Sequence, residues 1–285
     1  MVRQRAGRER HEERIAQREK ETAQQTRVST RAQQSGSART LVVSGLVLLG
    51  AWQLVTTLGQ YPKWLLPAPL DVVLRLAQAW ADGTLAQHVV PTVIESVGGF
   101  AVALLFGTTL GYLVAHSPTL ERWLMPYLAA LQSIPVIAVA PLIIIWLGYS
   151  SDLVRNILVA AIVVFFPIFS STITGIRTIP RELREVGQVE GANRWQRLRY
   201  IEWPLALPVL FSGFRTSLAY ATTGAVVGEF IGSRYGLGAL INVARGFFDT
   251  PLIFVALLCL ALITLLFHSL LIGLERVLLP WHREA

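Results

Sequence analysis

Apolar residues form long runs along most of this chain, and shorter polar stretches separate the runs. Six runs approach or exceed about twenty residues, the length that an α-helix needs to cross the hydrocarbon core of a bilayer. They lie near residues 41–59, 92–116, 124–148, 153–176, 205–231 and 252–275. The pattern therefore predicts an all-α integral membrane protein with six transmembrane helices.

The first forty residues differ from the rest of the chain. Residues 1–40 are polar, basic, poor in aromatic residues and mixed in charge, which is typical of segments without a stable fold. We expect a disordered cytoplasmic tail, followed by a transmembrane domain over residues 41–285. The run at 41–59 is longer than the apolar core of a secretory signal and lacks a small-residue cleavage site after it, so we interpret it as a retained first span.

Arginine placement orients the predicted helices. Six spans put both termini on one side of the membrane, together with the loop at 177–204, and cytoplasmic segments are enriched in Lys and Arg. That loop contains Arg177, Arg181, Arg184, Arg194, Arg197 and Arg199. The loop and both termini are therefore predicted to be cytoplasmic, and this placement accounts for the net charge of +7 without a nucleic-acid partner. Only 15% of the residues are charged, against about 25% in a soluble domain.

Between the first two spans, a Pro-rich stretch leads into a pattern typical of an amphipathic helix after Pro69. The residues spaced for its apolar face are Val72, Val73, Leu76, Ala79 and Trp80. Two interpretations remain open for this external segment: a helix lying in the membrane interface, or a helix packed on the transmembrane bundle.

The polar segment Glu185–Pro208 interrupts the apolar chain. Its pattern predicts a short helix around Arg181–Glu190, a break at Gly191 and a second helix around Arg194–Tyr200, which the Trp203-Pro204 pair ends. A glycine at the break lets a partner approach the backbone closely, and arginine and tryptophan are frequent interface anchors. We expect this hairpin to dock on a cytoplasmic protein.

The spacing within this hairpin resembles the EAA motif of binding-protein-dependent ABC importer permeases. That motif is Glu-Ala-Ala, three residues, Gly, nine residues and Ile-x-Leu-Pro. Here it reads Glu185-Val186-Gly187, then Gly191, then Ile201-Glu202-Trp203-Pro204. The residues at 186, 187 and 203 depart from the commonest ones, whereas the Glu, Gly, Ile and Pro spacing is intact. The segments LLPAPLDVV, LQSIPVIAVAPLIIIWLG and VVGEFIGSRYGLGALI are also similar to this family, so the resemblance covers residues 62–281.

The resemblance implies a type I importer permease in the cell membrane, with a coupling loop at 177–204. The residues that it assigns to coupling are Glu185, Gly187, Gly191, Ala192, Trp195, Ile201 and Pro204. The implied partners are two cytoplasmic ATPase subunits, an external solute-binding protein and a second copy of the chain. The chain has no G-x-x-x-x-G-K-[ST] sequence, so we expect the ATPase to be a separate subunit.

The likeness to one branch of the family bears on the substrate. The stretch RGFFDTPLIFVALLCLAL is similar to permeases for riboflavin or the thiamine pyrimidine precursor. Nitrate, aliphatic sulfonates and taurine are the alternative substrates within the same branch.

Residues for a substrate path are predicted from breaks and charges within the spans. Prolines remove backbone hydrogen bonds and bend a helix, and such breaks often border a cavity. The candidate path residues are Gln132, Ser133, Pro135, Pro141 and Glu229. Glu95 and Arg215 are instead expected to extend toward the membrane interfaces. Arg215 and Glu229 are fourteen residues apart, about 21 Å along a helix, so each needs another partner.

Small residues recur four apart in two spans, as Gly107 and Gly111 and as Gly224, Gly228 and Gly232. We interpret these faces as helix-packing surfaces. A role in lining the path is the alternative.

Other functional classes find little support. His88, His116 and His268 lack metal-ligand spacing, and the single cysteine, Cys259, allows no disulfide within the chain, so we expect no metal or cofactor. A membrane-embedded enzyme would need convergent catalytic groups, which the spans do not show. A secondary transporter, the more distant alternative, would usually carry more intramembrane carboxylates and an internal repeat.

Overall fold

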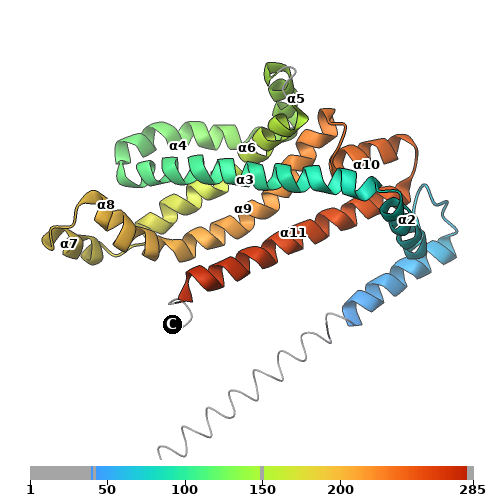
Figure 1. Cartoon of the computed structure of the whole chain (residues 1–285), viewed down its shortest axis with the longest axis horizontal. Helices are drawn as coiled ribbons and strands as arrows, with labels where there is room; N and C mark the ends of the chain where they lie inside the picture. Colours follow the sequence, from blue (N-terminus) through green and yellow to red (C-terminus); the bar gives the residue numbers. More distant parts are fainter. Residues whose placement is uncertain (1–39, 41–42, 148–150, 281–285) are drawn as a thin grey trace, which may run out of the picture. The chain divides into compact units, whose positions relative to one another are not determined.

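The computed structural model describes residues 40, 43–147 and 151–280, and every element in these residues is helical (Figure 1). The chain divides into two units, Met1–Pro62 and Lys63–Ala285. The first unit contains the helix Val43–Gly59, where the first span was predicted. The predicted disordered tail at 1–40 lies almost wholly outside the described residues and stays a prediction.

Three long helices form the centre of the second unit: α3 (Thr84–His116), α6 (Asp152–Arg177) and α9 (Trp203–Gly232). α6 packs against both of the others, and small residues make the contacts close. A Cβ atom on Gly99 of α3 would lie 2.4 Å from Ala160 Cβ, and one on Gly224 of α9 would lie 2.7 Å from Ala160 Cα. Within a bilayer, where apolar burial gives little drive, such close backbone approach stabilises helix pairs.

The predicted glycine faces are confirmed as packing surfaces at four of five positions. A Cβ on Gly107 or Gly111 of α3 would lie 3.0 Å or 2.8 Å from a side-chain atom of α6. A Cβ on Gly228 of α9 would lie 2.7 Å from Asn156 Oδ1 of the same helix, α6. Gly232 has room for a Cβ, at an ordinary 3.5 Å from Ile144.

The predicted third span is not one straight helix. It consists of α4 (Pro118–Gln132) and α5 (Val136–Leu147), which are bent by 99° at the break between them. The N–H groups of Ser133 and Ile134 bond to carbonyls three residues back, and Pro135 has no N–H to continue the α-helical pattern. The bend predicted at Pro135 is confirmed, and Figure 1 shows α4 beside α3 with α5 turning away.

Three further helices pack together beside this centre. α11 (Thr250–Leu278) packs against α9, α10 (Leu237–Gly246) and α2 (Pro69–Ala81). α10 lies between the last two predicted spans, and the sequence pattern did not predict it. It is short, and it buries Leu237 and Leu240.

The amphipathic helix α2 packs against α11 and α3, as the second of the two interpretations predicts. Val72 and Ala79 are buried, whereas Trp80 is 77% exposed. Arg75 Nε lies 2.8 Å from Asp249 Oδ2 just before α11. At the start of α2, a hydrogen bond from Lys63 lowers the pKa of the Asp71 carboxyl.

By length and composition, α3, α6 and α11 each qualify as membrane spans among the described residues, and the bent α4–α5 pair can count as a fourth. Val43–Gly59 is apolar but shorter, and α9 is not among the helices that qualify. The structure thus supports an all-helical membrane protein, and the count of six remains a prediction.

Candidate functional site

The polar hairpin begins with α7 (Arg181–Val189), and this helix ends just before Gly191, as predicted. The Gly191 N–H donates to the Gln188 carbonyl at 3.0 Å, and the Ala192 N–H donates to the Gly187 carbonyl at 2.9 Å. This is the hydrogen-bond pattern of the Schellman motif, which needs a residue with positive φ after the helix. Gly191 has φ +74°, which explains why a glycine stands there.

The second arm of the hairpin is also capped locally. The Asn193 side chain accepts from the Gln196 N–H, and the Gln196 side chain accepts from the Asn193 N–H, both at 2.8 Å. This capping box starts α8 (Arg194–Arg197), which leads into a π-helical turn, η1 (Leu198–Glu202).

The predicted end of the second arm at Trp203-Pro204 is wrong, because the helical path continues into α9. The Trp203 N–H bonds to the Leu198 carbonyl five residues back, in the wider pattern of η1. Pro204 then lies in the first turn of α9, where a missing N–H is tolerated.

The two arms pack together where the motif departs from its commonest residue. Gly187 is buried, and a Cβ there would lie only 2.6 Å from Ile201 Cδ1. Glycine therefore lets this isoleucine approach the first arm closely.

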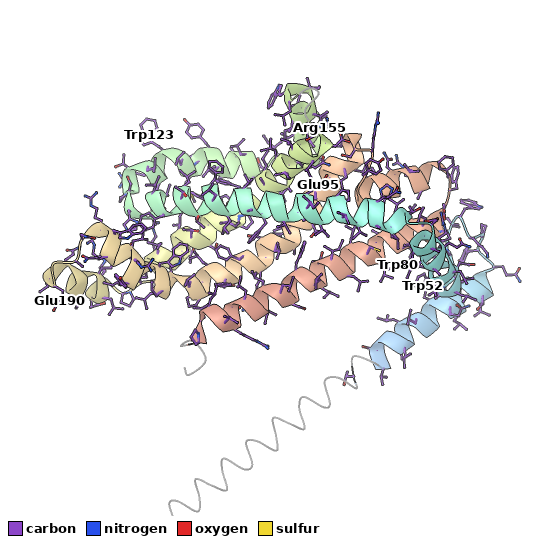
Figure 2. All side chains as sticks on the ribbon, in the orientation of Figure 1. Trp52, Trp80, Glu95, Trp123, Arg155 and Glu190 are labelled. Atoms are coloured by element: carbon purple, nitrogen blue, oxygen red, sulfur yellow. The ribbon has the colours of Figure 1, made fainter. Side chains whose placement is uncertain are left out.

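The remaining coupling candidates face outward to different degrees. Glu185 and Gly191 are exposed, and Trp195 is 67% exposed. Ala192 and Pro204 are half-buried. Figure 2 places Glu190 at the tip of the hairpin, away from the bundle. The hairpin thus satisfies its own backbone and leaves a charged and aromatic surface open to a partner.

Polar contacts also link the helices at this end of the bundle to one another and to the hairpin. Arg177, at the end of α6, makes a bidentate ion pair with Glu121 of α4, with N–O distances of 2.7 Å and 2.6 Å. The Arg184 guanidinium of α7 donates to the Ile176 carbonyl.

A buried polar cluster lies at the opposite end of the bundle, around Glu229 of α9. The Thr92 hydroxyl of α3 donates to Glu229 Oε1 at 2.5 Å, and the Gly238 N–H of α10 donates to Oε2 at 2.6 Å. The Leu237 N–H donates to Thr92 Oγ1 at 2.9 Å. Glu229 is 1% exposed, so both carboxylate oxygens hold α3, α9 and α10 together.

Glu95 belongs to the same region, and the expectation that it extends to the interface is wrong. It is 2% exposed, and its Oε1 accepts from Asn156 Nδ2 of α6 at 2.9 Å. The same amide nitrogen lies 2.8 Å from Ser233 Oγ. The partner of Glu95 belongs to another helix, and residue spacing along the chain does not show which helices lie side by side.

Arg215 has a partner on another helix, as its distance from Glu229 along the chain required, because it forms an ion pair with Glu275 of α11. The prediction that Arg215 and Glu229 do not pair with each other is confirmed.

Comparison with known proteins identifies the family. The family model described as the inner membrane component of binding-protein-dependent transport systems matches residues 103–284. The chain is 54% identical over 241 residues to the riboflavin transport system permease RibX of Chloroflexus aurantiacus, which covers 85% of this chain and 89% of the relative. The chain belongs to this permease family. It is the permease component of an ABC importer in the inner membrane.

Further relatives and a solved structure agree with this assignment. The permease is 34% identical to a putative aliphatic sulfonate permease, SsuC, of Bacillus subtilis, over 84% of this chain and 86% of the relative. It is 31% identical to the formylaminopyrimidine permease ThiX of Halalkalibacterium halodurans, over 84% and 94%. An inward-facing structure of the MetNI methionine ABC transporter matches with a TM-score of 0.59 and 20% identity, covering 68% of this chain and 95% of that one. The last match concerns the fold alone.

The predicted path residues of the permease fall in two places. Gln132, Ser133 and Pro135 lie at the bend between α4 and α5, and Pro141 lies within α5; all four are exposed. Glu229 is buried, with its hydrogen bonds directed to α3 and α10. The structure does not bring Glu229 into one site with the residues of the bend, and the roles of all five stay predictions.

His88 and His116 take part in contacts with other helices. His88 Nδ1 lies 2.8 Å from the Gly236 carbonyl, and His116 contacts Glu202. Among the described residues, no group of three or more His, Cys, Asp or Glu side chains is placed to hold a metal ion.

Proposed function

We propose that this permease forms the translocation path for riboflavin or a related aromatic vitamin or precursor. The observation that carries the proposal is the 54% identity to a riboflavin permease over 85% of the chain. The 31% identity to a formylaminopyrimidine permease supports the wider class of aromatic heterocycles. Aliphatic sulfonates, with a relative at 34%, and taurine, with one at 30%, are the second candidates, together with nitrate.

The charges of the long helices favour a substrate other than a small anion. Arg215 is engaged by Glu275, and Arg155 by Asp152 at 2.6 Å. A path for a small anion would be expected to present cationic groups that are available to the substrate.

The proposed assembly contains two copies of this permease, two cytoplasmic ATPase subunits and an external solute-binding protein. The hairpin formed by α7, α8 and η1 is the proposed ATPase contact, because its backbone is capped within the hairpin and Trp195 remains exposed. Aromatic and arginine side chains on such a surface are typical of energetic anchors at interfaces.

The proposed topology has six spans, with the termini and the hairpin in the cytoplasm. The spans are Val43–Gly59, α3, the α4–α5 pair, α6, α9 and α11. In this arrangement the bend at Ser133-Pro135 borders the path near the middle of the membrane, where irregular backbone is tolerated beside a cavity.

Substrate choice is tested by reconstituting the permease with its ATPase and binding protein in proteoliposomes. We expect ATP-dependent, saturable uptake of radiolabelled riboflavin or of formylaminopyrimidine. Taurine and nitrate, supplied at the same concentration, are expected to give no uptake above that of liposomes without ATP. Uptake of taurine or nitrate without uptake of either heterocycle would contradict the proposed substrate class.

The ATPase contact is tested by replacing Trp195 with alanine. Loss of an aromatic anchor costs about 2 kcal/mol or more, so co-purification of the ATPase should fall at least roughly tenfold. Trp80→Ala is the matched control, since Trp80 is equally open, at 77% against 67% exposed, but lies on α2 at the other end of the bundle. Equal co-purification with both variants would argue against docking through the hairpin.

A further inference from the structure

The turn η1 stands between the hairpin and the long helix α9. Its five residues, Leu198–Glu202, follow α8 and lead directly into α9. Single π-helical turns are rare overall, but those that occur are often found at functional sites. Here the turn aims its last residue, Glu202, into the bundle, where Glu202 is 4% exposed.

Glu202 binds two side chains of α3, which is not its neighbour along the chain. The Tyr112 hydroxyl donates to Oε2 at 3.0 Å, and His116 Nε2 lies 3.2 Å from Oε1. Tyr112 and His116 are one helical turn apart, and their ring centroids are 4.3 Å apart. Both carboxylate oxygens are therefore occupied by one face of α3.

A buried carboxylate is costly unless it is hydrogen-bonded and close to positive charge. Glu202 meets the first condition, because α3 supplies a polar partner to each of its two carboxylate oxygens.

The contact completes the attachment of the hairpin to the central helices. The chain itself joins the hairpin to α6 and α9, and the Arg184 bond to the Ile176 carbonyl reinforces the first junction. Glu202 adds α3, whose glycines already pack closely on α6. Rigid helices joined in this way move as one body when one end is displaced.

We propose that Glu202 is a positioning residue that clamps α3 to the coupling hairpin, so that a displacement of the hairpin moves α3 together with α6 and α9. This inference rests on the proposed docking of the hairpin on the ATPase. Without the clamp, the hairpin still docks and the ATPase still binds nucleotide, but the end of α3 that carries Tyr112 and His116 follows the hairpin less closely.

The test follows the movement of α3 in the complete complex without depending on the substrate. A cysteine replaces Leu113, which is 50% exposed beside Tyr112, in a chain whose single cysteine is removed by Cys259→Ser. The rate of maleimide labelling is measured before and after trapping the ATPase with ATP and vanadate. We expect trapping to change the rate by at least about fivefold, at the lower end of couplings between distant sites.

Tyr112→Phe removes one hydroxyl and keeps the ring, so it is the decisive variant. It should reduce the change in labelling rate to less than about twofold, with ATPase co-purification unchanged, because a hydrogen bond to a charged group is lost. Tyr127→Phe, at an exposed tyrosine of α4, is the matched control and should keep the full change. Glu202→Ala should resemble Tyr112→Phe, and the double variant should show no further loss, because both act through one contact.

Three results would overturn the clamp: no change at position 113 in the unmutated complex, a full change in Tyr112→Phe, or additive losses in the double variant. If Glu202→Ala fails to accumulate, Tyr112→Phe alone decides. If the hairpin is not the ATPase contact, the ATPase should still co-purify with Trp195→Ala. This result distinguishes a failure of the docking proposal from a failure of the clamp. Normal docking with a full labelling change in Tyr112→Phe would reject the clamp alone.

Discussion

The two ends of the central bundle are held together by different means. At one end, Glu229 joins α3, α9 and α10 through buried hydrogen bonds, and it is 1% exposed. At the other end, the hairpin is held by its own caps at Gly191 and Asn193, and its tip is open. The first end therefore depends on contacts between helices. The hairpin at the second end can keep its local shape while its surface remains available to a partner.

The largest loss of stability is expected from Gly236→Val, which changes a residue beside Glu229 at the buried end of the bundle. Gly236 has φ +113° and ψ 157°, a region that is nearly exclusive to glycine, and a Cβ there would lie 2.2 Å from Glu229 Cδ. Backbone strain and overpacking together should destabilise the protein by about 3 to 5 kcal/mol. The measurement is thermal denaturation of the purified permease in detergent.

Gly246→Val is the control for this prediction. Gly246 is the last residue of α10, which Gly236 precedes; its φ is not positive, and no atom lies within 4 Å of the position that a Cβ would take. The melting temperature of this variant should therefore stay near that of the unmutated chain. Equal melting temperatures for the two variants would show that the buried end tolerates disruption.

A smaller and local effect is expected from Gly191→Val at the open end. The positive φ of +74° disfavours valine by about 1 to 2 kcal/mol, but nothing lies within 4 Å of the added carbon. The hairpin should distort while the bundle keeps its melting temperature within a few degrees, and stimulation of ATP hydrolysis should be lost.

Gly83→Val is closely matched to that variant, with φ +78° and equally open space, but it lies between α2 and α3 at the other end of the bundle. It should keep ATPase stimulation. Loss of stimulation in both variants would mean that general strain, and not the hairpin, is responsible.

The smallest effect is expected from the ion pair between Arg177 and Glu121. Their side chains are 40% and 29% exposed, and partly exposed pairs contribute about 0.2 to 1 kcal/mol. A double-mutant cycle with Arg177→Ala and Glu121→Ala, followed by thermal denaturation, should give a coupling in this range. A cycle with Thr92→Val and Glu229→Ala should give a larger one, since both groups are buried. The reverse order would refute the contrast between the two ends.

The hairpin was largely predictable because its structure is encoded locally. Gly191, Asn193 and Gln196 act on neighbouring residues, so their spacing alone indicates a break between two helices. The bend near Pro135 was predictable for the same reason, because proline removes a hydrogen bond of its own helix. The continuous path through η1 was missed, since a π-helical turn has no clear pattern in the sequence.

The partners of the charges within the long helices were not predictable. Glu95 bonds to Asn156, and Arg215 to Glu275, across sixty or more residues of chain. An apolar pattern identifies the helix that carries such a charge but does not state which helix lies beside it. Only docking of the helices brings these groups together.

The sequence by itself determined that the chain is a helical membrane protein with a capped polar hairpin, because apolar run length, proline and glycine act over one or two turns of helix. The tertiary structure decided that Glu229 closes one end of the bundle and that Glu202 reaches α3 at the other. These contacts depend on how closely α3, α6 and α9 approach, and that distance is set by glycines facing a neighbouring helix.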